Sequence, residues 1–234
     1  MTRGVYVTGT DTGVGKTLVS ASLLAALNAS RVRAVGMKPV ASGCESTSDG
    51  LRNEDALALL AQSYGAPDYA LINPFALQNP VAPHIAARDA GMDIILEPID
   101  AAFNALSTNT DCIIVEGVGG WCVPLSDTLM QSDLVRSLDL PVILVVGLRL
   151  GCINHALLSA RAIVADSCEM IGWIGNRTDP HMLCIDENIA TLRERLPAPC
   201  LGFLPFAENA DARRMGAHLG AAVTAISAAC RPAP

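Results

Sequence analysis

Short apolar runs alternate with longer segments of helical period along most of the chain. The runs are rich in Val, Ile and Leu and mostly lack apolar–polar alternation, which is typical of parallel strands buried on both faces. They predict strands at 5–8, 34–38, 112–116, 142–147, 171–176 and 200–204. The intervening segments predict helices at 16–28, 54–63, 98–106, 132–138, 154–166, 185–196 and 211–229.

This order of strands and helices predicts right-handed β-α-β units. The expected fold is therefore an α/β three-layer sandwich, with a mostly parallel central sheet flanked by helices. A chain of 234 residues without repeats or long linkers suits a single domain spanning 1–234. Only the proline-bearing stretch 64–83 fits neither period, and we expect a loop excursion near a site there. Ligands of such sheets bind at the carboxyl ends of the strands.

Composition and charge exclude several protein classes. With 51% hydrophobic and 17% charged residues, the chain is not disordered, and its longest apolar run, 141–148, is too short to cross a bilayer. A net charge of −7 argues against nucleic acid or anionic membrane as a partner. No two of the eight cysteines form a C-x-x-C pair, which excludes zinc-ribbon and thioredoxin sites. Because no signal peptide precedes the first strand, we expect a cytoplasmic protein in a reducing environment.

The first predicted strand is followed by a glycine-rich loop, Gly9-Thr10-Asp11-Thr12-Gly13-Val14-Gly15-Lys16-Thr17, and then by a helix. This context predicts a phosphate-binding loop, in which backbone amides and the helix N-terminus meet phosphate oxygens. Lys16 would reach the β- and γ-phosphates, and the Thr17 hydroxyl would bind Mg²⁺. The loop is a variant, because the usual first glycine is replaced by Thr10.

Lysine is rare in this chain, since the 16 basic residues include only Lys16 and Lys38. Lys38 ends the second predicted strand, where it could face the same phosphates. A compact ammonium on a flexible stem follows a moving phosphoryl group better than a rigid guanidinium does. An ordinary solvated lysine at a strand end is the alternative. Ser42, a few residues later, would serve as a hydroxyl donor or simply as a turn residue.

Two carboxylates are candidate metal ligands. Glu116 ends the apolar third strand and is followed by Gly117-Val118-Gly119-Gly120, which is the position of a Walker-B-like Mg²⁺ ligand. Asp55 begins a predicted helix, where it could instead act only as a favourable charge at the helix start. Together with Thr17 and phosphate oxygens, these carboxylates would give Mg²⁺ its oxygen ligands.

Taken in order, these motifs resemble the dethiobiotin synthetase family of ATP-dependent ligases. The resemblance covers most of the chain, up to about residue 208. It includes the loop 9–17, the segments 38–43 and 50–57, and the strand end at 115–121 with 124–127. It continues through 141–146, 150–156, 172–176 and 197–202.

The resemblance implies carboxylation and ring closure of 7,8-diaminononanoate with CO₂ and ATP, with Mg²⁺ as cofactor. Lys16 and Lys38 would be catalytic, and the metal ligands would be Thr17, Asp55 and Glu116. It implies nucleotide contacts from Gly13, Val14, Gly15, Lys16, Thr17, Leu18, Asp55, Glu116, Gly117, Val118, Gly119, Asn176, Arg177 and Pro205. It implies substrate contacts from Thr12, Lys38, Ser42, Gly151, Cys152 and Asn154.

The segment 151–155 carries a further implication of the resemblance. In this family it opens a helix whose amides receive the substrate carboxylate from a neighbouring subunit, so we expect a homodimer with shared sites. A helix N-terminus suits a carboxylate, because its backbone amides and partial positive charge bind anions.

Two other functions remain as alternatives. A partitioning-type ATPase switch would share the fold but carries a signature lysine at the position of Thr10. A cobyrinate-type amidotransferase would need an additional glutaminase domain, for which 234 residues leave no room.

Overall fold

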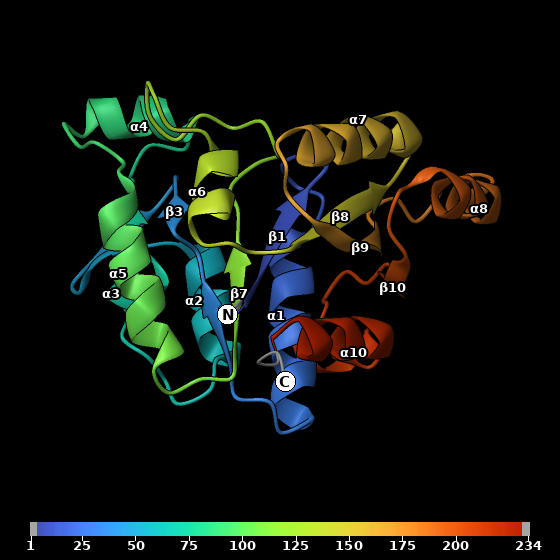
Figure 1. The fold of residues 1–234 in the computed structure, drawn as a ribbon, viewed down its shortest axis with the longest axis horizontal. Coiled ribbons are helices and arrows are strands. Elements are labelled where there is room, and N and C mark those ends of the chain that lie inside the picture. The colour runs from blue at the N-terminus through green and yellow to red at the C-terminus, as the bar shows by residue number, and fades with distance from the viewer. Residues whose placement is uncertain (1–3, 231–234) are drawn as a thin grey trace.

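A six-stranded, all-parallel sheet forms the centre of the computed structural model, which describes residues 4–230 (Figure 1). The strand order is β10-β9-β8-β1-β7-β2. The strands are β1 (Gly4–Gly9), β2 (Ala34–Met37), β7 (Cys112–Glu116), β8 (Val142–Leu148), β9 (Met170–Arg177) and β10 (Cys200–Leu204). Since β1, β7 and β2 are neighbours, the chain segments that follow them converge at one end of the sheet.

Helices cover both faces of this sheet. One side carries α1 (Lys16–Ala29), α2 (Glu54–Gln62), α9 (Ala212–Gly216) and α10 (Gly220–Ala229). The other side and the edges carry α3 (Tyr69–Ile72), α4 (Pro83–Asp89), α5 (Leu96–Ser107), α6 (Gln131–Ser137), α7 (Cys152–Ala165) and α8 (Ile185–Arg195). The predicted three-layer α/β fold is confirmed.

The core follows from the alternation of side chains along the strands. Val5 and Val7 of β1 pack against α1 and α10, whereas Tyr6 between them packs on the opposite face. Both faces are apolar and buried, which explains why the strands read as unbroken hydrophobic runs. None of the helices within 4–230 has the length and hydrophobicity that crossing a bilayer requires.

Several predicted boundaries differ from the structure. The second strand was expected to include residue 38 but ends at Met37, so Lys38 lies just beyond the sheet. The single helix expected at 211–229 is wrong, because a turn at 217–219 divides it into α9 and α10. Gly216 ends α9 in close approach to α1, since a Cβ on it would lie 2.9 Å from the carbonyl oxygen of Ser22.

The stretch 64–83 is more ordered than a loop excursion. It contains α3 and the short strand β6 (Phe75–Ala76), which pairs in parallel with β3 (Val40–Ala41), and α4 begins at Pro83. A small hairpin formed by β4 (Glu45–Thr47) and β5 (Gly50–Arg52) precedes α2. These elements have two to four residues, except for α4, and are too short to show a hydrophobic period.

Candidate functional site

The glycine-rich loop connects β1 to α1 at the carboxyl end of the sheet. Its last glycine, Gly15, is left-handed at φ 88° and precedes α1 without any side-chain cap, so the helix N-terminus remains open for an anion. The Lys16 ammonium turns back over the loop and donates to the carbonyl oxygen of Asp11 at 3.1 Å. Burial and the neighbouring Lys38 charge lower the pKa of Lys16 to about 8. This geometry is that of a phosphate-binding loop.

Lys38 lies at the centre of a buried ionic cluster. Its ammonium donates to Asp55 Oδ2 at 2.8 Å, Glu116 Oε1 at 2.6 Å and the Gly117 carbonyl oxygen at 3.1 Å. All three N–H donors therefore have partners. Burial alone would lower the pKa of Lys38, but the charges of Glu116 and Asp55 outweigh burial and raise it. The same attraction outweighs burial at Asp55 and lowers the pKa of that carboxyl group.

Glu116 also joins this cluster to the phosphate loop. Its Oε1 accepts a hydrogen bond from the Thr17 hydroxyl at 2.8 Å. The sheet brings Thr17, Lys38, Asp55 and Glu116 together although they come from four segments of the chain. The solvated-lysine alternative for Lys38 is wrong, because only 2% of the residue is exposed.

The carboxylates fit a magnesium ion by their chemistry. Glu116 is fully buried, and its Oε2 atom has no hydrogen-bond partner. An orphaned carboxylate oxygen beside a hydroxyl and a second carboxylate is a donor set that a hard cation satisfies. Within 4–230 no group of three or more His, Cys, Asp and Glu side chains could hold a metal ion by itself.

Asn73 and Gln131 hold loops of the site in place, and neither was among the residues expected from the sequence. The buried Asn73 amide donates to the Lys38 carbonyl oxygen at 2.7 Å, and the Lys38 backbone N–H donates to Ile72 at 2.7 Å. The segment 64–83 therefore fixes the backbone of Lys38. Gln131 accepts from the Val118 backbone N–H at 2.9 Å and donates to the Gly120 carbonyl oxygen at 2.6 Å. No local motif marks either residue, because each acts on a loop distant in sequence.

The glycine loop after β7 lies beside the phosphate loop. A Cβ added to Gly120 would lie 3.6 Å from the carbonyl oxygen of Gly9, and one on Gly119 would lie 3.7 Å from the Thr12 hydroxyl. Of the expected residues, Gly119 is therefore next to the loop that carries Thr12, whereas a Cβ on Gly117 would meet Tyr6 and Gln131.

Asn176 at the end of β9 contacts the phosphate loop directly. Its amide donates to the Val14 carbonyl oxygen at 2.9 Å and occupies the space where a side chain on residue 15 would begin. Only glycine at position 15 permits this contact. Arg177 donates to the Pro180 carbonyl oxygen at 2.8 Å, and Pro205 lies exposed after β10. Leu18 is half-buried in the first turn of α1.

The predicted substrate residues fall into two groups. Thr12 and Ser42 are in the loops that follow β1 and β3, and the Ser42 carbonyl oxygen accepts a hydrogen bond from Asn53 at 3.4 Å. The second group, Gly151, Cys152 and Asn154, begins α7 after β8. Gly151 is left-handed at φ 96°, and no side chain caps the helix. The Cys152 backbone N–H donates to the Arg149 carbonyl oxygen at 3.0 Å, and the amides that follow it have no side-chain cap.

An ion pair connects these two groups. Arg149, just before Gly151, donates to the Asp11 carboxylate at 3.0 Å. The other Asp11 carboxylate oxygen accepts from the Thr12 backbone N–H at 2.8 Å. Asp11 was not among the expected site residues, although it lies inside the phosphate-loop motif.

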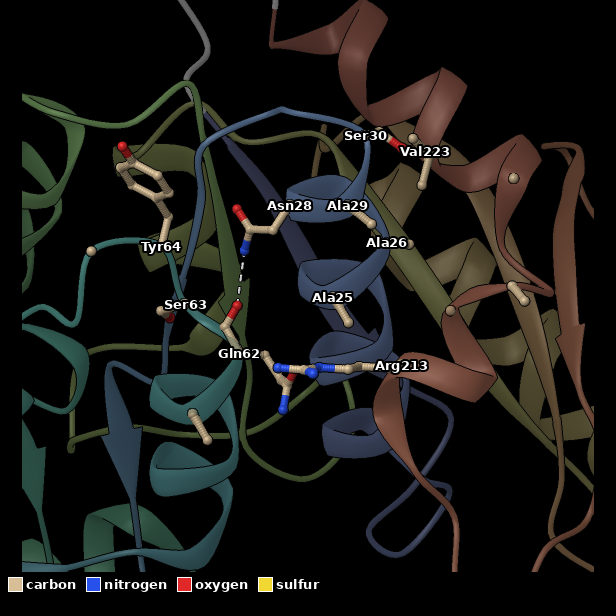
Figure 2. Close-up of a pocket in the computed structure, with 15 residues that line it drawn as sticks. Ala25, Ala26, Asn28, Ala29, Ser30, Gln62, Ser63, Tyr64, Arg213 and Val223 are labelled. Carbon is tan, nitrogen blue, oxygen red and sulfur yellow. Dashed lines mark hydrogen bonds between the residues drawn. The ribbon is translucent and has the colours of Figure 1, made fainter.

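A cavity of about 1000 Å³ lies away from this site, between α1, α2, α9 and α10 (Figure 2). It is lined mostly by small residues near the C-terminus of α1, whereas the phosphate loop is at the other end of that helix. A 14-residue helix is about 20 Å long, so the two are well separated. Asn28, on its wall, is already bonded to the Gln62 carbonyl oxygen at 2.8 Å. The cavity belongs to helix packing rather than to the candidate site.

Comparison with known proteins places the chain among P-loop enzymes. A family model described as an AAA domain matches residues 3–214. The ATP-dependent dethiobiotin synthetase BioD of Xanthomonas euvesicatoria pv. vesicatoria is 61% identical over 207 residues, covering 88% of this chain and 92% of that protein. The protein of the same name from Xylella fastidiosa strain 9a5c is 60% identical over 200 residues, covering 86% and 88%.

Solved structures agree on the fold at much lower identity. The MinD cell division protein of Aquifex aeolicus superposes with a TM-score of 0.55 and 17% identity, covering 99% of each chain. A ParA family ATPase of Chlorobium tepidum gives a TM-score of 0.53 and 16% identity, covering 97% of this chain and 95% of that one. At this identity the likeness concerns architecture alone.

Proposed function

The chain belongs to the ATP-dependent dethiobiotin synthetase family, and from that premise we propose that it carboxylates 7,8-diaminononanoate with CO₂ and closes the ring to dethiobiotin. ATP is consumed, and ADP and phosphate are released. The observation that carries the proposal is the cluster of Lys16, Thr17, Lys38, Asp55 and Glu116 at one edge of the sheet.

Each step of the proposed reaction needs positive charge near the reacting oxygens, and this cluster supplies it. One amine of the substrate and CO₂ form a carbamate, whose oxygen attacks the γ-phosphorus of ATP. The second amine then attacks the carbamic–phosphoric anhydride and expels phosphate. Negative charge moves across the reacting oxygens throughout, so fixed cations provide the stabilisation. Lys16 serves the β- and γ-phosphates, and Lys38 serves the carbamate and the transferring phosphoryl group.

Lys38 must exchange a partner to do this. Its three donors are all bonded to Asp55, Glu116 and Gly117, so contact with substrate requires it to leave at least one of these acceptors. The backbone stays in place, because Asn73 and Ile72 hold it. The flexible four-carbon stem of lysine permits this motion at a fixed backbone, which a planar guanidinium would not match.

Thr17, Asp55 and Glu116 are the residues that would hold Mg²⁺. The bound ion would neutralise phosphate charge during transfer. The hydroxyl of Thr17 and the free Oε2 of Glu116 favour this assignment.

The remaining expected residues have roles consistent with their positions. The amides of the loop, including Gly13, Val14, Gly15 and Leu18, would hold phosphates, together with Gly117, Val118 and Gly119 opposite. Asn176, Arg177 and Pro205 would border the base. Thr12 and Ser42 would contact the diamine.

A homodimer completes the substrate site in this proposal. The open N-terminus of α7, with Gly151, Cys152 and Asn154, would receive the substrate carboxylate of the neighbouring subunit. Leu150 beside it is 92% exposed, so an apolar side chain is available there for a subunit contact. We place this activity in the cytoplasm, where its small-molecule substrates are made and used.

The test is phosphate release with ATP, Mg²⁺, bicarbonate and the diamine, each omitted in turn. Release should need all four, with dethiobiotin identified by mass spectrometry. Phosphate release that ignores the diamine and rises with DNA or a protein partner would instead indicate an ATPase switch.

A further inference from the structure

Two cysteines distant in sequence are in contact at the end of β7 that lies opposite the candidate site. Cys112 begins β7 and is buried, and Cys230 directly follows α10 and is half-buried. Their sulfur atoms are 2.8 Å apart, although 118 positions separate them along the chain. A disulfide bond is about 2.05 Å long, so bonding needs a movement of less than about 1 Å.

We propose that Cys112 and Cys230 are an oxidation site, at which a peroxide converts the two thiols into a reversible disulfide that ties α10 to the central sheet. The overall step is balanced as two thiols and one hydrogen peroxide giving one disulfide and two waters. Peroxide first oxidises one sulfur to a sulfenic acid with loss of one water. The second thiol then attacks that sulfur, the S–O bond breaks, and the hydroxide leaves with the thiol proton as the second water.

Cys230 is the sulfur that peroxide oxidises first. It is half-buried, whereas Cys112 is 1% exposed. The contact with Cys230, together with burial, raises the pKa of the Cys112 thiol well above its usual value. Because peroxide must reach a sulfur to oxidise it, the buried Cys112 resists direct oxidation, and its contact with Cys230 makes it the resolving thiol.

The bond would be remote from the candidate site. Cys112 is the first residue of β7 and Glu116 is the last, about 13 Å farther along the strand. The disulfide would close a loop from β7 to the end of α10, which contains four of the six strands of the central sheet. A loop of this length strongly restricts the unfolded chain, so stability rises while the ATP-binding edge stays as it is.

The remaining cysteines determine which protein the experiment should start from and which variant is its control. Cys122 and Cys184 are exposed and would react without regard to the fold. No other pair of cysteines between residues 4 and 230 is joined by a hydrogen bond. The full-length double variant Cys122→Ser/Cys184→Ser is therefore the starting protein, and the same chain with Cys230→Ser is the control.

The experiment treats both proteins with hydrogen peroxide, alkylates them in denaturant and maps the peptides without reduction. The starting protein should lose two alkylation sites and yield one cross-linked peptide pair containing Cys112 and Cys230. Its Tm should rise by on the order of 10 °C, and dithiothreitol should reverse the rise. The Cys230→Ser control should show neither change.

Three results would overturn the proposal. Both cysteines could remain fully alkylatable after oxidation. Cys230 could proceed to a sulfinic acid without any cross-link. The control could show the same rise in Tm as the starting protein. Because Cys230 is half-buried, its serine variant should fold, and a folded control keeps the comparison valid.

Discussion

The Lys38 ammonium lies 2.6 Å from Glu116 Oε1, and both side chains are almost fully buried. A buried lysine and a buried glutamate each have a high cost of desolvation, which their mutual attraction offsets. The pair therefore keeps two opposite charges in the interior before any substrate arrives. In the proposed reaction Lys38 would be both a structural and a catalytic residue, and the two roles call for different variants.

Lys38→Arg keeps the positive charge and tests whether the reaction needs an ammonium group at this position. We expect turnover to fall at least about 100-fold, because a rigid fork cannot follow the transferring phosphoryl group. Lys38→Met removes the charge and leaves Glu116 unpaired, which should lower stability by about 3–5 kcal/mol in nucleotide-free protein. Phosphate release and chemical denaturation measure the two effects. Full activity in Lys38→Arg would show that the ammonium has no chemical role.

Glu116→Gln tests the proposed metal ligand. The Mg²⁺ concentration for half-maximal turnover should rise about tenfold or more, because the amide is a weaker ligand for a hard cation. Asp111→Asn is the control, since Asp111 is exposed and pairs with Arg33 on the surface near the other end of β7. An unchanged Mg²⁺ titration in Glu116→Gln would count against its metal role.

Lys16→Ala removes the cation of the phosphate loop. Turnover should fall on the order of 1000-fold, because the β- and γ-phosphates would lose the ammonium that turns back over the loop. ATP affinity, measured by calorimetry, should fall as well. The stability of the fold should change little, since the Lys16 ammonium is bonded only to a backbone carbonyl oxygen. Turnover at the wild-type rate would disprove the loop assignment.

Two glycine variants separate backbone strain from crowding. Gly13 and Gly15 both have positive φ, so alanine at either position costs about 1–2 kcal/mol. A Cβ on Gly13 would meet nothing within 4 Å, whereas one on Gly15 would overlap the Asn176 amide. Gly15→Ala should therefore weaken ATP binding at least tenfold more than Gly13→Ala. Equal losses would show that Asn176 does not shape the loop.

Leu150→Glu tests the proposed dimer. A charge at this exposed position should prevent subunit association and yield a monomer in sedimentation velocity, with loss of turnover. Tyr64→Glu, on the wall of the cavity between α1, α2, α9 and α10, is the matched control and should leave association unchanged. A Leu150→Glu variant that stays dimeric and active would place the interface elsewhere.

Elements with strong hydrophobic patterns were predictable from the sequence. All six strands of the central sheet were expected, because buried parallel strands contain continuous runs of Val and Ile. The helices between them were expected too, but the single helix expected after the last strand is divided into α9 and α10. The phosphate loop was predictable because strand, loop and helix are contiguous. Short elements such as β6 and α3 were not, since their conformation depends on contacts with Lys38 and β3.

The site was predictable only in part. Lys38, Asp55 and Glu116 were expected near one another, but their direct ionic contact was not, because pairing across strands depends on register and side-chain rotamers. Asn73 and Gln131 left no local signal. Each holds a loop by hydrogen bonds that span 35 and 11 to 13 positions of the chain.

The hydrogen bond from Asn176 to Val14 has a kinetic consequence. It connects the loop to a strand that is two positions away from β1 in the sheet, so the loop has its shape before nucleotide arrives. The loop therefore loses its conformational entropy during folding, and ATP binding does not include that entropic cost. ATP should accordingly associate in a single kinetic phase whose observed rate increases linearly with ATP concentration, without the plateau that a slow loop rearrangement would impose.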